Sequence, residues 1–228
     1  MVALVLLLVA ALVSCGGRSA TDTGRAGLQR LLDRRSTAVL DRDRAAFLRT
    51  GALSWFENLR GVPLAAWSYR VTALHRTGGG ATADAELRYR LQDYDHAPVT
   101  VGRTLALSRD AEGRWYVDSD TPARKSAQQL WDQGEVSVVR GRHSLVLGTG
   151  RSSEELHMYA DLADRAVPAV SGAWRSDWAR HVVVQAPRTL AGMAGPLGSP
   201  PPPHPGIAAV PPAGVGGPAP PAPDRRLG

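Results

Sequence analysis

Ala83-Asp84-Ala85-Glu86-Leu87-Arg88-Tyr89-Arg90-Leu91 is the stretch that decides the fold, because it alternates apolar and polar residues without a break. Successive side chains of a β-strand point to opposite faces, so this period of two predicts a strand with one buried face and one solvated face. Strands of this kind are typical of an antiparallel sheet that is covered on one side only. The stretch therefore predicts such a sheet.

Three further segments show the same alternation, and they lie on both sides of the first: Trp67–Ala73, Val99–Leu107 (interrupted by Arg103) and Trp115–Val117. Glycine-rich or polar turns separate these segments, at Gly78-Gly79-Gly80 and at Asp110–Gly113. Turn residues between alternating runs are the signal for strands that follow one another as hairpins. The sequence therefore predicts a four-stranded meander.

A helical pattern precedes the strands, from about Arg25 to Thr50, with Gly51 in the position just past a helix. Its apolar stripe consists of Leu28, Leu32, Val39 and Ala46. This stripe predicts that the helix covers the apolar face of the sheet. Arg35 lies near the stripe, and we expect its stem to follow the rim with the guanidinium in water.

One long helix, one shorter helical or turn segment at Leu53–Leu59 and then a four-stranded meander resemble the NTF2-like (SnoaL-like) α+β cone, over roughly residues 25–120. Trp115-Tyr116-Val117 is similar to the last strand of such domains. The resemblance implies a curved sheet around the helix and a mouth that can hold a small ligand. The aromatic residues that could line this mouth are Trp55, Trp67, Tyr69, Tyr89 and Trp115. Plain core packing is the favoured alternative for them.

Candidate catalytic residues are few. Asp93, Asp95 and His96 resemble an acid–base cluster of SnoaL-type cyclases, but these residue types are also common in turns, which is the favoured interpretation. Gly148-Thr149-Gly150 is too short to cradle a phosphate and also indicates a turn. The sequence holds no Ser-His-Asp arrangement and no phosphate-binding loop, so no catalytic activity is expected.

A second unit is predicted over residues 135–195, after a linker at residues 121–134. Two β runs flank Gly141-Arg142-His143 and predict a hairpin. Ser152 and Glu155 form a capping-box pair for a helix, which Pro168 should kink or shorten. An apolar strand at His181–Gln185 and a helix beginning at Arg188 follow.

This order resembles the opening of the peptidase-MA-like, gluzincin-type domain found after NTF2-like segments in actinobacterial lipoproteins, and Val138–Gly148 and Val182–Thr189 carry the resemblance. The zinc motif of that family, HExxH, places two histidines and a glutamate on one helix. The sequence contains no HExxH, so no metal ligand is carried over and no cofactor is expected. A metallopeptidase remnant and a small-molecule isomerase remain alternatives to a binding module.

Met1–Cys15 contains a short apolar run, Val2–Val13, which is too short to span the ~30 Å hydrocarbon core of a bilayer and resembles a signal peptide. Leu12-Val13-Ser14-Cys15 is typical of a lipobox, in which Cys15, the only cysteine, becomes the lipidated first residue. Residues 1–14 are thus the predicted signal and 15–24 a tether. Because no Lys or Arg precedes Cys15, we hypothesise a true start upstream of Met1.

The net charge of +6 comes from arginines that are spread along the chain, which argues against nucleic-acid binding and favours attraction to anionic lipid headgroups. The predicted partner is therefore a membrane, reached through Cys15, on the extracytoplasmic face of the cell envelope. Residues 196–228 are rich in Pro, Gly and Ala and are expected to be disordered. A shifted reading frame is our hypothesis for this tail. The predicted function is a binding or accessory module.

Overall fold

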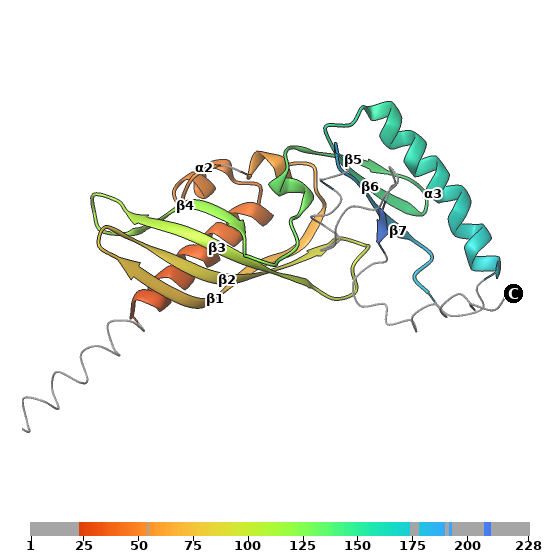
Figure 1. The fold of residues 1–228 in the computed structure, drawn as a ribbon. Helices are drawn as coiled ribbons and strands as arrows, with labels where there is room; N and C mark the ends of the chain where they lie inside the picture. The colour runs from red at the N-terminus through yellow and green to blue at the C-terminus, as the bar shows by residue number, and fades with distance from the viewer. Residues whose placement is uncertain (1–22, 54, 174–177, 190–191, 193–207, 211–228) are drawn as a thin grey trace, which may run out of the picture.

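The computed structural model describes residues 23–53, 55–173, 178–189, 192 and 208–210. The predicted signal, Cys15 and most of the predicted tail lie outside these residues. The described chain is a mixed α+β protein with two four-stranded sheets, one towards each end of an elongated molecule (Figure 1). Within the described part, no helix has the length and apolar character needed to cross a membrane.

The first sheet confirms the predicted meander. Its strands are antiparallel and lie in chain order: β1 (Leu64–Thr77), β2 (Gly80–Leu91), β3 (Val99–Arg109) and β4 (Trp115–Pro122). The alternating stretch lies in β2, where each apolar residue from Ala83 to Leu91 is buried. Register shifts between Val71 and Ala73 and between Ala106 and Leu107 mark irregularities, which bend and twist a sheet.

The predicted single helix is wrong in its length. Residues 23–40 are helical and lie on one face of the first sheet (Figure 1), and a separate short helix, α2, covers Arg44–Leu48. The break occurs at Arg42, whose φ of 56° is left-handed and incompatible with a continuing helix. Asp43 then caps α2, since its side chain accepts a hydrogen bond of 2.8 Å from the Ala46 N–H.

The expectation for Arg35 is also wrong, because this side chain is only 1% exposed. Its guanidinium carbon lies 3.7 Å from the centre of the Phe47 ring, and the guanidinium donates hydrogen bonds to Thr50 Oγ1 (3.2 Å) and the Ala52 carbonyl (3.1 Å). Burial lowers the pKa of Arg35. The short second helix turns the chain back over Arg35, so acceptors and a ring replace the water that was expected there.

The second sheet mixes parallel and antiparallel pairs. Its strands are β5 (Val136–Arg140), β6 (Ser144–Thr149), β7 (Val182–Ala186) and β8 (Ala208–Val210). β5 and β6 form the predicted hairpin, and β7 lies parallel to β6. β8 pairs with β7, so three residues of the segment predicted to be disordered form an edge strand.

Helix α3 (Ser153–Ala173) connects the two parallel strands. The predicted capping box is present, because the Ser152 N–H donates to Glu155 Oε2 (3.0 Å) and the Glu155 N–H donates to Ser152 Oγ (3.2 Å). Pro168 was predicted to kink or shorten this helix, and it does not shorten it, since α3 continues past Pro168 to Ala173. Pro168 lies on the exposed side, where water can reach the carbonyl group left without its helical partner.

Strand β6 is buried on both faces. Leu145 and Leu147 belong to the large core that includes the first sheet, whereas Val146 packs with Leu156 and Ala160 of α3. A strand covered on both sides has a continuous apolar run instead of an alternating one. The two sheets therefore share one core, with α3 as the outer layer.

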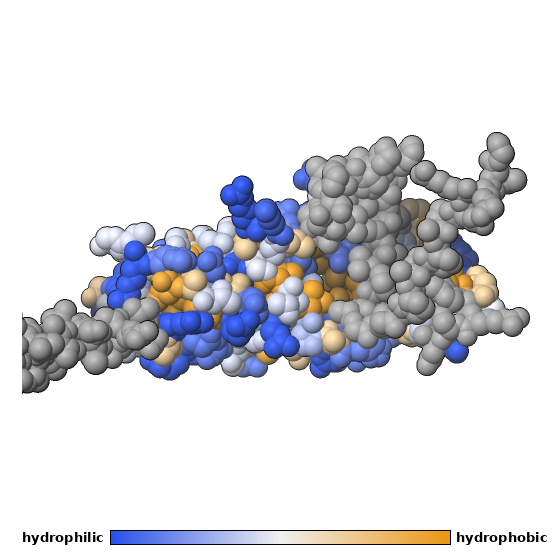
Figure 2. Space-filling model, turned by 60° about the horizontal axis from the view of Figure 1, so that its bottom comes forward, coloured by the Kyte–Doolittle hydropathy of each residue, from blue (hydrophilic) through white to orange (hydrophobic). Residues whose placement is uncertain are grey.

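Polar side chains cover much of the visible surface around the first sheet, with small apolar areas between them (Figure 2).

The predicted linker is part of this core. It contains a short 3-10 helix, η2 (Leu130–Asp132), in which Trp131 is 3% exposed. The Trp131 ring lies 5.6 Å from the Trp67 ring and 5.0 Å from the Tyr89 ring, between centroids. The predicted linker, residues 121–134, thus contributes buried side chains to the core that the two sheets share.

Arg103 interrupts the alternating pattern of β3 because it is a buried cation with two acidic partners. Its side chain is 1% exposed and lies on the core face. Arg103 Nε donates to Asp120 Oδ1 (2.6 Å), and Nη1 and Nη2 donate to the two carboxylate oxygens of Asp132 (2.9 Å each). Burial lowers the pKa of Arg103, but Asp132 and Asp120 outweigh it, so the pKa is raised. This buried cation joins β3, β4 and η2.

Candidate functional site

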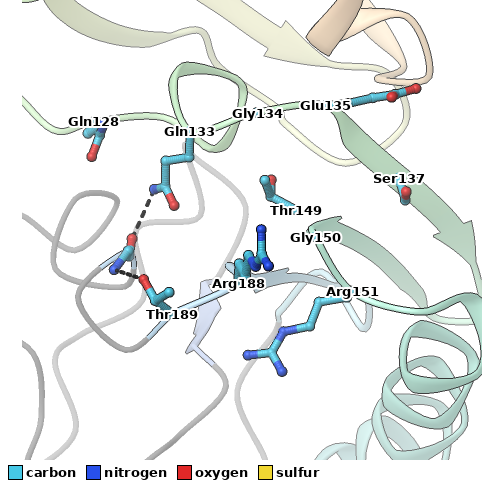
Figure 3. A pocket seen from close by; sticks show the side chains of 11 residues that line it. Gln128, Gln133, Gly134, Glu135, Ser137, Thr149, Gly150, Arg151, Arg188 and Thr189 are labelled. Atoms are coloured by element: carbon cyan, nitrogen blue, oxygen red, sulfur yellow. Dashed lines mark hydrogen bonds between the residues drawn. The ribbon is translucent and has the colours of Figure 1, made fainter.

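A polar cavity lies where the parallel strands β6 and β7 end. Its volume is about 750 Å³. The lining comes from the chain on both sides of η2, the start of β5, the end of β6 with the residues after it, and the chain after β7: Gln128, Gln133, Gly134, Glu135, Ser137, Thr149, Gly150, Arg151, Arg188, Thr189 and Gly192 (Figure 3). Ligands of sheets with parallel strands commonly bind outside the carboxyl ends of those strands. We call this cavity the carboxyl-edge pocket.

Gly150 allows the pocket to form. Its φ of +62° is left-handed, so the chain turns sharply after β6 at a position that favours glycine. A Cβ atom on Gly150 would lie 2.8 Å from Arg188 Cδ and 3.1 Å from Arg188 Cγ. The missing side chain therefore lets the stem of Arg188 pack directly on the β6 turn.

Arg151 joins the ends of the two parallel strands. Its Nε and Nη2 atoms donate to the Pro187 carbonyl (3.0 and 2.8 Å), and Nη1 lies 3.3 Å from Glu155 Oε1. The backbone hydrogen bond from Ser152, together with the Arg151 charge, lowers the pKa of Glu155. Glu155 is therefore ionised near neutral pH and partly offsets the charge of Arg151.

Arg188 is the less constrained cation of the pocket. Its side chain is exposed and makes no hydrogen bond or ion pair with any other residue of the described chain. Thr149, Arg151 and Arg188 line the same space (Figure 3), and Glu135 is the only acidic residue among the lining residues. The guanidinium of Arg188 is therefore available to an anion, and arginine binds carboxylate and phosphate groups through two parallel hydrogen bonds.

Gln133 and Thr189 shape the opposite wall. Gln133 Nε2 donates to the Gly192 carbonyl (2.9 Å), and Thr189 Oγ1 accepts a hydrogen bond from the Gly192 N–H (3.1 Å). Both side chains keep further polar groups for a ligand. Among the residues that the structure describes, no group of three or more His, Cys, Asp or Glu side chains is placed to hold a metal ion.

Three of the predicted pocket residues pack in the core. Trp55, Trp67 and Tyr89 are buried, with 5.5 Å between the centroids of the two tryptophan rings and 6.2 Å from Trp67 to Tyr89. The Tyr89 hydroxyl donates to Gln129 Oε1 (2.7 Å), and burial raises the pKa of Tyr89. These contacts are those of the core-packing alternative.

The other two predicted aromatic residues differ in their further contacts, although the Tyr69 ring also lies 6.3 Å from the Trp67 ring, between centroids. The hydroxyl of the buried Tyr69 donates to Asp120 Oδ2 (2.5 Å) and so belongs to the Arg103 network. Trp115 is partly exposed, and the Arg109 guanidinium lies 4.0 Å from the centre of its ring. Trp115 lines a second cavity at the other end of the first sheet.

The residues of the acid–base hypothesis form a turn after β2. Asp95 is 7% exposed, and its Oδ2 atom accepts a hydrogen bond from the Leu91 N–H (2.8 Å). Asp93 has a left-handed φ of 67°, which aspartate tolerates in turns, and His96 is exposed. The Asp95 carboxylate thus holds the backbone of the turn.

Sequence patterns did not reveal the carboxyl-edge pocket. The pattern Gly148-Thr149-Gly150 indicates only a turn, and Arg151 and Arg188 lie 37 positions apart in the sequence. The signal in the sequence is a buried strand that is followed by a glycine, an arginine and a capping box, and then a second buried strand that is followed by Pro187-Arg188. Parallel pairing of the two strands was the missing step. No protein-family model, curated protein or solved structure matches the chain.

Proposed function

We propose that the chain is a lipid-anchored binding module of the cell envelope, and that its carboxyl-edge pocket binds a small anionic ligand. The observation that carries this proposal is the exposed guanidinium of Arg188, which has no partner among the described residues and is held on Gly150 beside Arg151 at the ends of two parallel strands. Charge-assisted hydrogen bonds of this kind favour carboxylate or phosphate groups.

The proposed anchor is a diacylglycerol group on Cys15, which follows the lipobox-like Leu12-Val13-Ser14. We further assign residues 25–120 to an NTF2-like domain and residues 135–195 to an incomplete peptidase-MA-like segment. The meander with its covering helix supports the first assignment, and the β5–β6–α3–β7 order supports the second. Neither assignment implies a catalytic group in the carboxyl-edge pocket.

Ligand binding is tested by calorimetric titration of the full chain carrying Cys15→Ser with inorganic phosphate and with malonate. We expect saturable binding of at least one of these anions. Arg188→Gln should weaken it by about tenfold or more, because a hydrogen bond to a charged group contributes about 1.5–3 kcal/mol. The control is Arg142→Gln, which removes the same charge from the exposed β5–β6 turn. Equal loss in both variants, or no binding of either anion, would contradict the proposal.

The anchor is tested separately by fractionating cells that express the natural chain or Cys15→Ser. We expect the natural chain in the membrane fraction and the serine variant to be released, because serine cannot carry the thioether-linked lipid. A serine variant that stays fully in membranes, including after a high-salt wash, would contradict the lipid anchor without affecting the pocket.

A further inference from the structure

A second arginine cluster lies at the end of the first sheet where the described chain begins. The helix over residues 23–40, the end of β1 and the β3–β4 turn meet there around a cavity of about 730 Å³. Five arginines line this cavity, and its lining includes no acidic residue: Arg30, Arg34, Arg76, Arg109 and Arg114. We call this surface the anchor-side cluster.

The three segments are packed closely enough to make one surface. A Cβ atom on Gly24 would collide with the Arg76 guanidinium, and one on Gly27 would lie 3.9 Å from Arg30 Nη2 and from Trp115 Cδ1. The space-filling view shows hydrophilic side chains around a small apolar area at this end of the described chain (Figure 2). The arginines therefore share one face although they come from distant parts of the sequence.

The cluster keeps an excess of positive charge. Arg114 pairs with Asp110 (2.8 Å) and Glu112 (2.9 Å), so these two carboxylates offset part of the positive charge of the five arginines. Arg30 and Arg34 are exposed and have no ion pair or hydrogen-bond partner from their guanidinium groups within the described residues. These two cations are the ones most available to a partner.

Trp115 adds an amphipathic ring to the cluster. It is partly exposed, and its ring faces the Arg109 guanidinium at 4.0 Å. Tryptophan and arginine together suit the boundary between water and lipid, where the ring lies at headgroup depth and the guanidinium meets phosphate groups.

We propose that the anchor-side cluster is a membrane-contact surface that binds anionic phospholipid headgroups. The orientation of the molecule on the membrane, with this cluster facing the lipid, rests on the proposed lipid anchor. Cys15 lies eight residues before Thr23, which is in the cavity lining, so even a fully extended chain reaches only about 28 Å. The two acyl chains of the proposed diacylglycerol group hold the chain at the bilayer, and an electrostatic contact with the headgroups adds to this attachment. The cluster supplies that contact and holds the second sheet, at the opposite end of the molecule, away from the membrane (Figure 1).

The test uses the full chain with Cys15→Ser, so headgroup binding is measured without the lipid. Vesicles of phosphatidylcholine, with or without phosphatidylglycerol, are sedimented with the protein at low and at physiological salt. We expect binding only to the vesicles that contain phosphatidylglycerol, and weaker binding at higher salt, because salt screens exposed charges. Arg30→Gln combined with Arg34→Gln should lower the partition coefficient by about tenfold or more.

The matched control is Arg60→Gln combined with Arg88→Gln, which removes two exposed charges away from the anchor-side cluster. We expect less than a twofold change in partition for this variant. Equal binding to neutral vesicles, equal loss in both double variants, or no binding to anionic vesicles would each overturn the inference. Because the assay contains no lipid modification and neither phosphate nor malonate, these outcomes are separate from those that test the anchor and the pocket.

Discussion

The two sheets are built from the same kinds of residues but by different pairing rules. Each strand of the first sheet pairs with its neighbour in the sequence, whereas β6 of the second sheet pairs in parallel with β7, across the whole of α3. In the meander, the end of each strand continues through a hairpin turn into the next strand. A parallel pair brings two strand ends to the same edge, and the Arg151 and Arg188 pocket forms there. The candidate binding site therefore depends on the pairing of β6 with β7, two strands that are far apart in the sequence.

The largest predicted effect concerns the ion network that joins the sheets. Arg103→Leu leaves Asp120 and Asp132 without their buried cation, and loss of one partner from such a network costs about 3–5 kcal/mol. We expect one cooperative unfolding transition at a lower denaturant concentration, because both sheets share a core.

The measurement is equilibrium denaturation followed by tryptophan fluorescence, with Arg88→Leu as the control. Arg88 lies on the exposed face of β2, so this change should stay within about 0.5 kcal/mol of the natural chain. Two separate unfolding transitions in Arg103→Leu, with only one of them shifted, would show that the sheets unfold independently. That result would contradict the shared core.

The next effect tests how closely α3 covers the parallel pair. A Cβ atom on Gly148 would lie 3.0 Å from Cδ1 of Leu156 and still closer to its Cδ2, and Leu156 is fully buried and has little room to move. Gly148→Ala should therefore lower the free energy of unfolding by about 1–3 kcal/mol through overpacking. Thermal unfolding measures this change.

The matched control is Gly172→Ala near the end of the same helix. Outside the neighbouring backbone of α3, no atom of the described residues lies within 4 Å of the added carbon, and alanine favours the helix, so we expect about 0.5 kcal/mol of stabilisation. Equal changes in the free energy of unfolding for Gly148→Ala and Gly172→Ala would contradict the packing of α3 on β6.

The smallest effect depends on pH and on Asp164 of α3. Its carboxylate accepts hydrogen bonds from the backbone N–H groups of Arg142 and His143 and from Ser144 Oγ. Burial raises the pKa of Asp164, but these hydrogen bonds outweigh it and lower the pKa overall. A lowered folded pKa gives stability that is present above the unfolded value of about 3.9 and is lost as the pH falls through the folded value.

Asp164→Asn should accordingly reduce stability by about 1 kcal/mol near neutral pH, and the difference from the natural chain should shrink in acid below the unfolded pKa. Denaturation at a series of pH values measures this. Asp161→Asn, on the exposed side of the same helix, is the control and should have little effect. A difference that grows in acid would contradict the assigned role of Asp164.

Much of the first sheet was predictable because its information is local. Alternation from Ala83 to Leu91 and the Gly78–Gly80 turn identified strands, order and buried faces. The break at Arg42 and the burial of Arg35 were not predictable, since a helix stripe does not show a left-handed residue or the acceptors that a later turn supplies. The carboxyl-edge pocket was missed for a related reason: strand periodicity does not state which strands pair.

The central claim is that the carboxyl-edge pocket, and not the anchor-side cluster, binds small anions. The most direct test compares anion binding at these two arginine-containing surfaces in one experiment. Amide chemical shifts of the full chain with Cys15→Ser are followed while phosphate or malonate is added. We predict saturable shifts at Gly150, Arg151, Arg188 and Thr189, with the Arg30 and Arg34 amides unchanged. Shifts confined to the anchor-side cluster, or spread evenly over exposed arginines, would contradict it.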